Sequence, residues 1–243
     1  MHKVLGFVAF RKGSKRLPLK NGKLLGGKTL YQITLEKLVN LKQRGIISGV
    51  VASTDCVEWQ SHCKQLFGND VVIHQRSEAI SGDFVNEGEV ILDFFNQHPQ
   101  FCDAAIMLSL CTYPYLKIEV MEAVALTYKQ HKTNVYAIKE THHMPQKLLR
   151  INDEGCIRPY FQDSMKQFES NTKLLKAKHP ISFNSTGLFL IHNAFEVLKD
   201  DMNLWNNDAI HGVVDDSFHL DIDTEEDFKL AELYSHFLES KLQ

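Results

Sequence analysis

Short apolar runs alternate with helical patterns through the first half of the chain, and no other feature restricts its fold as strongly. Runs typical of buried strands occupy residues 3–10, 49–54, 71–74, 104–110 and 133–139. The helical patterns between them occupy residues 29–41, 57–67, 85–95 and 118–128. Strands that alternate with helices form βαβ units around a mostly parallel sheet. We therefore predict an α/β, doubly wound fold with helices on both faces of the sheet.

The pattern changes after residue 140, where short strands among polar residues replace the alternation. Segments 147–151 and 157–161 flank a turn at 152–155, which predicts a β-hairpin inside an inserted lobe at about 141–183. The remaining predicted elements are a strand at 187–192 in the main sheet, a short strand at 218–222 and an amphipathic helix at 225–238.

Length and composition exclude several classes of protein. A chain of 243 residues, 44% of them apolar, is large enough for one globular domain with an inserted lobe. A net charge of -3 gives no global positive field for nucleic acid. No apolar run approaches the roughly 20 residues that span a bilayer, and the first run is too short for a signal peptide, so we expect a cytoplasmic protein without a membrane partner. The five cysteines are scattered without a C-x-x-C pair, which indicates neither a disulfide framework nor a zinc site.

Five cations crowd the loop F-R-K-G-S-K-R-L-P-L-K-N at residues 10–21, directly after the first strand. Ligands of α/β proteins bind beyond the carboxyl ends of the strands, where this loop begins. Backbone N–H groups and the side chains of arginine and lysine suit anionic oxygens. The loop is therefore predicted to hold a polyphosphate.

A pair of acids near the end of the chain is the second candidate site. Asp221 and Asp223 flank Ile222 at strand spacing, so both carboxylates would point to the same face and could bind Mg²⁺ together with substrate phosphates. The acids at 225–227 need no such role, because Thr224 and Asp227 fit a capping box. The alternative is that Asp223 helps to cap the helix and Asp221 is an exposed residue. Because the basic loop predicts a phosphate site, we favour metal binding by the two acids.

Residues 22–29 match the phosphate-loop pattern G-x-x-x-x-G-K-[ST] letter for letter. A true phosphate loop follows a buried strand that runs into its first glycine, whereas the residues before Gly22 are polar and include Pro18. Thr29 and Gln32 instead fit a capping box for the next helix. A phosphotransferase that uses Lys28 and Thr29 stays open as an alternative function.

The whole set of motifs resembles the acylneuraminate cytidylyltransferases, the CMP-sialic acid synthetase family. The resemblance lies in the basic loop, the following G-G-K-T-L, the S-T-D at 53–55, the pair His142–His143 and the closing D-I-D-T-E-E-D, in order from residue 9 to residue 232. It implies a single cytidylyltransferase domain over 1–243 with a Rossmann-like, GT-A-like fold, and a homodimer built partly through the inserted lobe. It also implies that CTP and a 2-keto-3-deoxy sugar acid give a CMP-sugar and pyrophosphate.

The resemblance also implies roles for individual residues. The residues that match the family's nucleotide site are Arg11, Gly13, Ser14, Lys15, Lys20, Asn21 and Arg76, with Lys20 near the departing pyrophosphate and Arg76 near the cytosine. Asp221 and Asp223 match the pair that binds the metal, Mg²⁺. The implied catalytic set is Arg11, Lys15, Lys20 and Asp221, which act by positioning and by stabilising charge on the phosphates.

Departures from the family pattern concentrate on the sugar side. The usual L-Q-P-T-S-P-L-R is S-L-C-T-Y-P-Y-L at 109–116, the usual R-P-N-G is N-S-T-G at 184–187, and the D-T-S-S-type turn is replaced at 81–86. The candidate sugar contacts are Thr112, Tyr113, His142, His143 and Asn184, although paired histidines are more often surface residues. The sugar substrate is therefore not fixed by the resemblance. We expect a different nonulosonic acid, or an octulosonic acid, at least as readily as N-acetylneuraminate. A non-catalytic relative that binds nucleotide is a further alternative.

Overall fold

The computed structural model describes residues 3–141, 148–151, 153, 155–160, 182–200, 210–215 and 218–241. The chain forms two compact units, residues 1–137 with 186–243 and residues 138–185. Among the described residues, no helix is long and apolar enough to cross a membrane.

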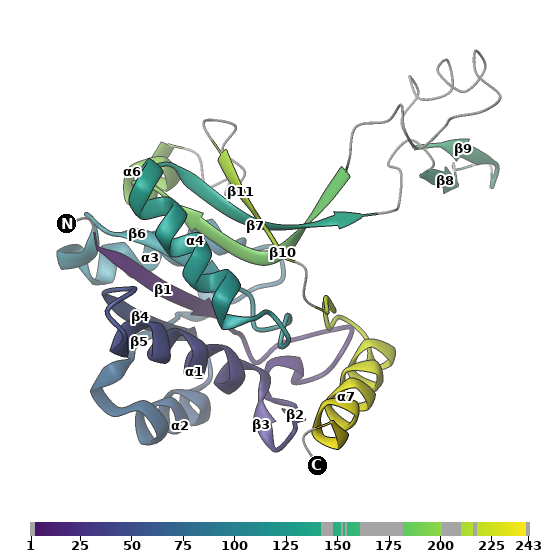
Figure 1. Cartoon of the computed structure of the whole chain (residues 1–243), viewed down its shortest axis with the longest axis horizontal. Helices are drawn as coiled ribbons and strands as arrows, with labels where there is room; N and C mark the ends of the chain where they lie inside the picture. The colour runs from purple at the N-terminus through teal and green to yellow at the C-terminus, as the bar shows by residue number, and fades with distance from the viewer. Residues whose placement is uncertain are drawn as a thin grey trace. The chain divides into compact units, whose positions relative to one another are not determined.

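A seven-stranded sheet forms the centre of the fold, in the order β11-β7-β10-β6-β1-β4-β5 (Figure 1). Its strands are β1 (Val4–Ala9), β4 (Gly49–Thr54), β5 (Val72–Gln75), β6 (Ala105–Ser109), β7 (Asn134–Thr141), β10 (Ser182–Ile191) and β11 (Ile210–Val214). β1 pairs in parallel with β4 and with β6, β4 pairs in parallel with β5, and β10 runs antiparallel to β6. The predicted mostly parallel α/β sheet is confirmed.

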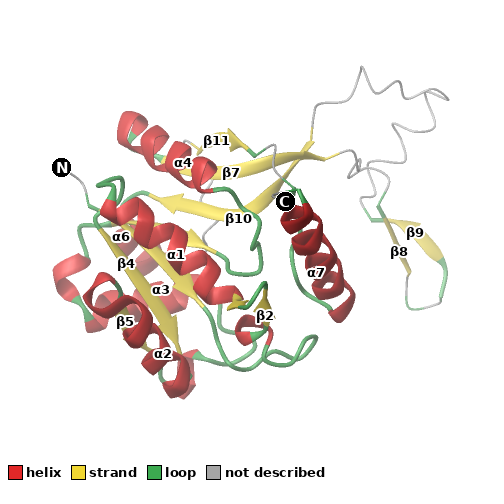
Figure 2. Ribbon diagram, turned by 60° about the horizontal axis from the view of Figure 1, so that its bottom comes forward, coloured by secondary structure: helices red, strands yellow, loops and turns green. Residues whose placement is uncertain are grey.

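Helices cover both faces of this sheet, as the two views in Figures 1 and 2 show. The helices of the βα units are α1 (Leu30–Gln43), α2 (Val57–Phe67), α3 (Glu87–Gln97) and α4 (Ile118–His131). Side chains alternate between the two faces along a strand, and β1 illustrates the result. Gly6 faces α1, where an added Cβ would lie 2.9 Å from Leu38. Phe7 faces α3, with its ring centroid 5.5 Å from that of Phe94.

The elements of the first half agree closely with the periodicity of the sequence, and α2 has the predicted bounds. Thr29 caps α1 by accepting a hydrogen bond from the backbone N–H of Gln32, but the Gln32 side chain donates to Glu36, so half of the predicted capping box forms. The box of Thr224 and Asp227 forms completely at the start of α7 (Glu225–Ser240).

The predicted strand at 218–222 is wrong. These residues form no strand, and their backbone joins the rest of the molecule through the N–H of Ile222, which donates to the carbonyl of Thr112 over 2.9 Å. The side chain of Ile222 is fully buried. Among the described residues, the sequence did not predict the helix α6 (Ala194–Asp200), the strand β11, or the two short strands between β1 and α1.

The second unit contains the predicted hairpin. Strands β8 (Leu149–Ile151) and β9 (Ile157–Pro159) pair antiparallel, with Ile151 opposite Ile157. Gly155, in the turn between them, has a φ of 77°, which glycine adopts without steric strain. His142 and His143 lie outside the described residues.

Candidate active site

A cavity of about 530 Å³ lies at the carboxyl ends of β1 and β6. The chain leaves β1 for β4 on one side, while β6 lies on the other side, so the cavity is at a switch point of the sheet, where open α/β folds bind ligands. The sequence-predicted residues on its wall are Arg11, Gly13, Ser14, Lys15, Lys20, Asn21, Arg76, Thr112, Asp221 and Asp223. The basic loop and the acid pair, about 200 residues apart, therefore share one cavity.

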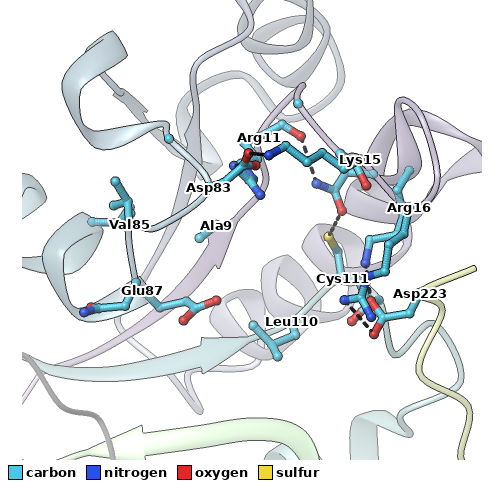
Figure 3. Close-up of a pocket in the computed structure, with 18 of the residues that line it drawn as sticks. Ala9, Arg11, Lys15, Arg16, Asp83, Val85, Glu87, Leu110, Cys111 and Asp223 are labelled. Carbon is cyan, nitrogen blue, oxygen red and sulfur yellow. Dashed lines mark hydrogen bonds and ion pairs between the residues drawn. The ribbon is translucent and has the colours of Figure 1, made fainter. Parts of the chain in front are cut away.

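Two cations of the loop meet at one carboxylate, as Figure 3 shows. Nη1 of Arg11 lies 2.8 Å from Oδ1 of Asp83, and Nζ of Lys15 lies 2.5 Å from Oδ2. The hydrogen bond from Lys15, and then that from Arg11, lowers the pKa of Asp83 below its ordinary value. Nothing in the sequence singles out Asp83, because an acid in a turn does not reveal which cations the fold brings to it.

Asn21 connects the basic loop to the end of β6. Its side-chain amide donates to the carbonyl of Arg11 over 2.9 Å, and its side-chain oxygen accepts from Sγ of Cys111 at 3.1 Å. Burial raises the pKa of Cys111 to about 12, so this thiol stays protonated and keeps its hydrogen. Asn21 thus fixes the position of Arg11 in addition to lining the cavity.

Arg76 follows β5 and is only 8% exposed. Its Nη2 donates to the carbonyl of Ser53 over 3.2 Å, whereas its Nε is buried and has no hydrogen-bond partner in the part of the chain that the structure describes. Burial lowers the pKa of Arg76, but an arginine remains charged near neutral pH. Arg76 also lines the cavity.

Ser53, His74 and Asp93 form a chain of hydrogen bonds that resembles the triad of hydrolases. Nδ1 of His74 lies 2.9 Å from Oγ of Ser53, and Nε2 lies 2.9 Å from Asp93. Ser53 and His74 are 0% exposed, so no substrate reaches the hydroxyl, and burial lowers the pKa of His74. This network supports the backbone of Ser53, whose carbonyl accepts the hydrogen bond from Arg76. It is not a nucleophilic site.

The two acids of the predicted metal site have different partners. Asp223 is held by Lys20 at 2.8 Å and by Arg16 at 3.0 Å. Asp221 accepts a hydrogen bond from the hydroxyl of Tyr113 over 3.0 Å through Oδ2, while its Oδ1 is buried without a hydrogen-bond partner among the described residues. Because 218–222 is not a strand, the two acids do not share a face through strand alternation.

The fit of these acids to a divalent cation is therefore unequal. Oδ1 of Asp221 is a hard oxygen ligand of the kind that Mg²⁺ prefers, whereas cations already neutralise Asp223. No group of three or more acidic, histidine or cysteine side chains among the described residues could hold a metal alone. Mg²⁺ commonly binds through one or two carboxylates and the phosphates of a substrate, and Asp221 fits that mode.

The predicted sugar contacts are scattered. Thr112 lines the cavity. Tyr113 is absent from the lining residues that the structure describes; its hydroxyl reaches Asp221, and burial raises its pKa, so that it acts as a donor. Asn184 is exposed on β10 in the second unit, and His142 and His143 lie outside the described residues. Contact of these residues with a sugar stays a prediction.

The phosphate-loop pattern at 22–29 does not form a phosphate loop. Gly22 ends a short 3-10 helix, and the following residues form the hairpin of β2 (Leu24–Leu25) and β3 (Lys28–Thr29). Nζ of Lys28 is paired with Glu36 at 2.6 Å. The absence of a strand entering Gly22 removes the structural basis for a phosphotransferase at this position.

The family model and the curated relatives that match this chain agree on one family. A family model described as cytidylyltransferase matches residues 5–240. N-acylneuraminate cytidylyltransferase from Oncorhynchus mykiss is 28% identical in an alignment of 172 residues that covers 66% of this chain and 38% of the trout protein. CMP-N,N'-diacetyllegionaminic acid synthase from Legionella pneumophila is 29% identical in an alignment of 166 residues that covers 66% of this chain and 69% of that protein. The chain thus matches well under half the length of the trout protein.

Two solved structures share the fold. A CMP:2-keto-3-deoxy-manno-octonic acid synthetase complexed with CTP superposes with a TM-score of 0.65 and 13% identity, covering 96% of this chain and 99% of that one. A 4-diphosphocytidyl-2C-methyl-D-erythritol synthase from Anaerococcus prevotii has the same TM-score of 0.65 with 10% identity, covering 96% of both chains.

Proposed function

The chain belongs to the cytidylyltransferase family, and on this premise we propose that it transfers CMP from CTP to the anomeric hydroxyl of a sialic-acid-like sugar acid, with release of pyrophosphate. The observation that carries this proposal is the single cavity in which the cations after β1 face Asp221 and Asp223. Positive side chains suit a triphosphate, and the acids suit the cation that accompanies it.

The proposed chemistry is a displacement at the α-phosphorus of CTP. The anomeric oxygen of the sugar forms a bond to that phosphorus as its O–H proton passes to water. The bond to the leaving pyrophosphate breaks, and the pyrophosphate keeps the bonding electrons. Negative charge grows on the phosphate oxygens, and Arg11, Lys15 and Lys20, which line the cavity, would stabilise it. Mg²⁺ held by Asp221 would add a Lewis acid that polarises these oxygens.

We infer a sugar acid of the nonulosonic class as the acceptor, because the legionaminic acid synthase is similar over 69% of its own length. The substitutions at 109–116 and 184–187 change the side chains that would face the sugar. A sugar other than N-acetylneuraminate is consistent with these changes.

A panel assay tests the proposed function. The protein is incubated with Mg²⁺, with CTP, UTP, ATP or GTP, and with one of several 2-keto-3-deoxy sugar acids, and pyrophosphate release is measured. We expect release only with CTP and with one sugar class. Binding of CTP without turnover on any sugar would favour the non-catalytic alternative, and equal release with ATP would overturn the assignment of CTP.

Replacement of the acid pair is a second test. Asp221→Ala is expected to lower kcat by about 100-fold or more, comparable to the loss of a preorganised electrostatic contact, and Asp223→Ala should also impair turnover by freeing Lys20 and Arg16. The melting temperature is measured beside kcat, because Tyr113 and Lys20 lose their partners in these variants, and a loss of turnover in a protein that is still folded assigns the effect to the site. Asp103→Ala, which removes a surface pair with Lys3, is the matched control. Normal turnover of Asp221→Ala at saturating Mg²⁺ would remove Asp221 from the site.

A further inference from the structure

Tyr113 occupies the position where the family pattern has a small serine, and its hydroxyl contacts the carboxylate assigned to the metal. The hydroxyl donates to Oδ2 of Asp221 over 3.0 Å. This contact leaves Oδ1 of Asp221 as the carboxylate oxygen that is buried and has no hydrogen-bond partner in the described part of the chain. The hydrogen bond to Oδ2 therefore fixes the orientation of the Asp221 carboxylate and leaves Oδ1 available to a ligand.

The backbone around Tyr113 is fixed from several sides. The carbonyl of Thr112 accepts from the N–H of Ile222 at 2.9 Å, which joins this loop directly to the residue after Asp221. Nζ of Lys37 on α1 donates to the carbonyls of Pro114 at 2.6 Å and Leu116 at 2.7 Å. The segment that carries Tyr113 and the segment that carries Asp221 are thus joined by a backbone hydrogen bond next to the contact between the two side chains.

The ring of Tyr113 packs against neighbours on more than one side. Gly187 on β10 has a φ of 74°, and a Cβ at this position would collide with the Tyr113 ring. The carbonyl of Gly187 accepts from the N–H of Leu110 at 2.8 Å, which holds the glycine against the loop. On another side, the ring centroid of His219 lies 4.9 Å away. Packing therefore restricts the ring, and with it the hydroxyl.

We propose that Tyr113 is a positioning residue that orients Asp221 so that Oδ1 binds the divalent cation of the CTP complex. The inference rests on the proposed function. It differs from the sugar contact expected from the sequence, because the hydroxyl donates to Asp221 and Tyr113 is not among the described residues that line the cavity. Partners that orient a metal ligand change metal affinity or activity by about 10–100-fold when they are removed.

The test is Tyr113→Phe, which keeps the ring against Gly187 and removes the hydroxyl. Binding of Mn²⁺, a spectroscopic substitute for Mg²⁺, is measured by electron paramagnetic resonance with CTP and without sugar. We expect the variant to bind Mn²⁺ about tenfold more weakly or worse. The Mg²⁺ concentration for half-maximal turnover should rise by a similar factor, with the KM for the sugar unchanged.

The matched control is Tyr115→Phe, which also removes one tyrosine hydroxyl from this loop. Tyr115 donates to the carbonyl of Ala231 and lies 2.8 Å from Oγ of Ser235 on α7, away from Asp221. It should leave Mn²⁺ binding unchanged. In addition, Tyr113→Phe in an Asp221→Ala background should have no further effect on Mn²⁺ affinity, because the two residues act as a unit.

Three results would overturn the inference. Unchanged Mn²⁺ affinity in Tyr113→Phe would exclude positioning of the metal ligand, while the proposed function could still stand. A raised KM for the sugar with unchanged metal dependence would return Tyr113 to the sugar site. A wild-type protein that binds no CTP would overturn the proposed function and the inference together.

Discussion

At the scale of the residue, Asp83 sets how much positive charge the cavity offers to the proposed substrate, CTP. Arg11 and Lys15 both contact its carboxylate, so CTP phosphates that bind these cations must compete with it. All three side chains are partly or largely exposed, and such ion pairs contribute only about 0.2–1 kcal/mol each. If CTP binds as proposed, Asp83 should lower the affinity for its phosphates modestly without preventing binding.

Asp83→Asn should therefore bind CTP about two- to fivefold more tightly than the wild type. The gain should shrink as salt is raised, because screening weakens exposed charges. Titration calorimetry at low and high salt measures both effects, with Asp103→Asn as a control for a surface acid far along the sequence. Weaker binding by Asp83→Asn would mean that Asp83 supports the nucleotide and does not compete with it.

At the scale of the element, Lys37 joins α1 to the loop that follows β6. Its ammonium donates to the carbonyls of Pro114 and Leu116, and burial lowers its pKa to about 8. In the unfolded chain the pKa of lysine is near 10.4. Between these two values the unfolded state binds more protons than the folded state, so the contribution of Lys37 to stability increases as pH rises.

Comparison of the wild type with Lys37→Met tests whether the contribution of Lys37 to stability increases with pH. The difference in free energy of unfolding, wild type minus variant, should increase from about pH 8 to about pH 10 and should be constant at lower pH. Denaturant titrations at several pH values measure it. Lys42→Met, which removes a lysine paired with Asp70 from the same helix, is the matched control for the loss of a lysine from α1. A difference that falls with rising pH would contradict the interpretation.

The elements themselves were predictable wherever local periodicity decides them, as in α2. Prediction failed at 218–222, where tertiary contacts hold an irregular segment whose composition is typical of a strand. The cavity followed from topology, because the carboxyl ends of parallel strands lie at one edge. The contacts of Asp83 and Tyr113 depend on how turns pack together, and no spacing in the sequence encodes that.

At the scale of the whole molecule, the resemblance to the acylneuraminate cytidylyltransferases is confirmed at the level of the family, over residues 5–240. The homodimer that the resemblance implies stays a prediction, and the second unit supplies an argument for it. Its hairpin exposes apolar side chains to 50% or more, at Leu148, Ile151, Ile157 and Tyr160. Ile151 and Ile157 lie opposite each other on one face of the hairpin, and neighbouring exposed apolar side chains are typical of interaction surfaces.

We therefore expect a dimer in solution that the hairpin stabilises. Ile151→Lys with Ile157→Lys places two charges on opposite residues of β8 and β9 and should raise the dimer dissociation constant by at least about tenfold, because buried unpaired charges oppose association. Sedimentation equilibrium measures the constant, and circular dichroism should be unchanged, since both side chains are exposed. Leu233→Lys, at an exposed apolar residue of α7, is the matched control. A dimer that this control dissociates, and the hairpin variant does not, would place the interface on α7; a monomeric wild type would exclude the dimer.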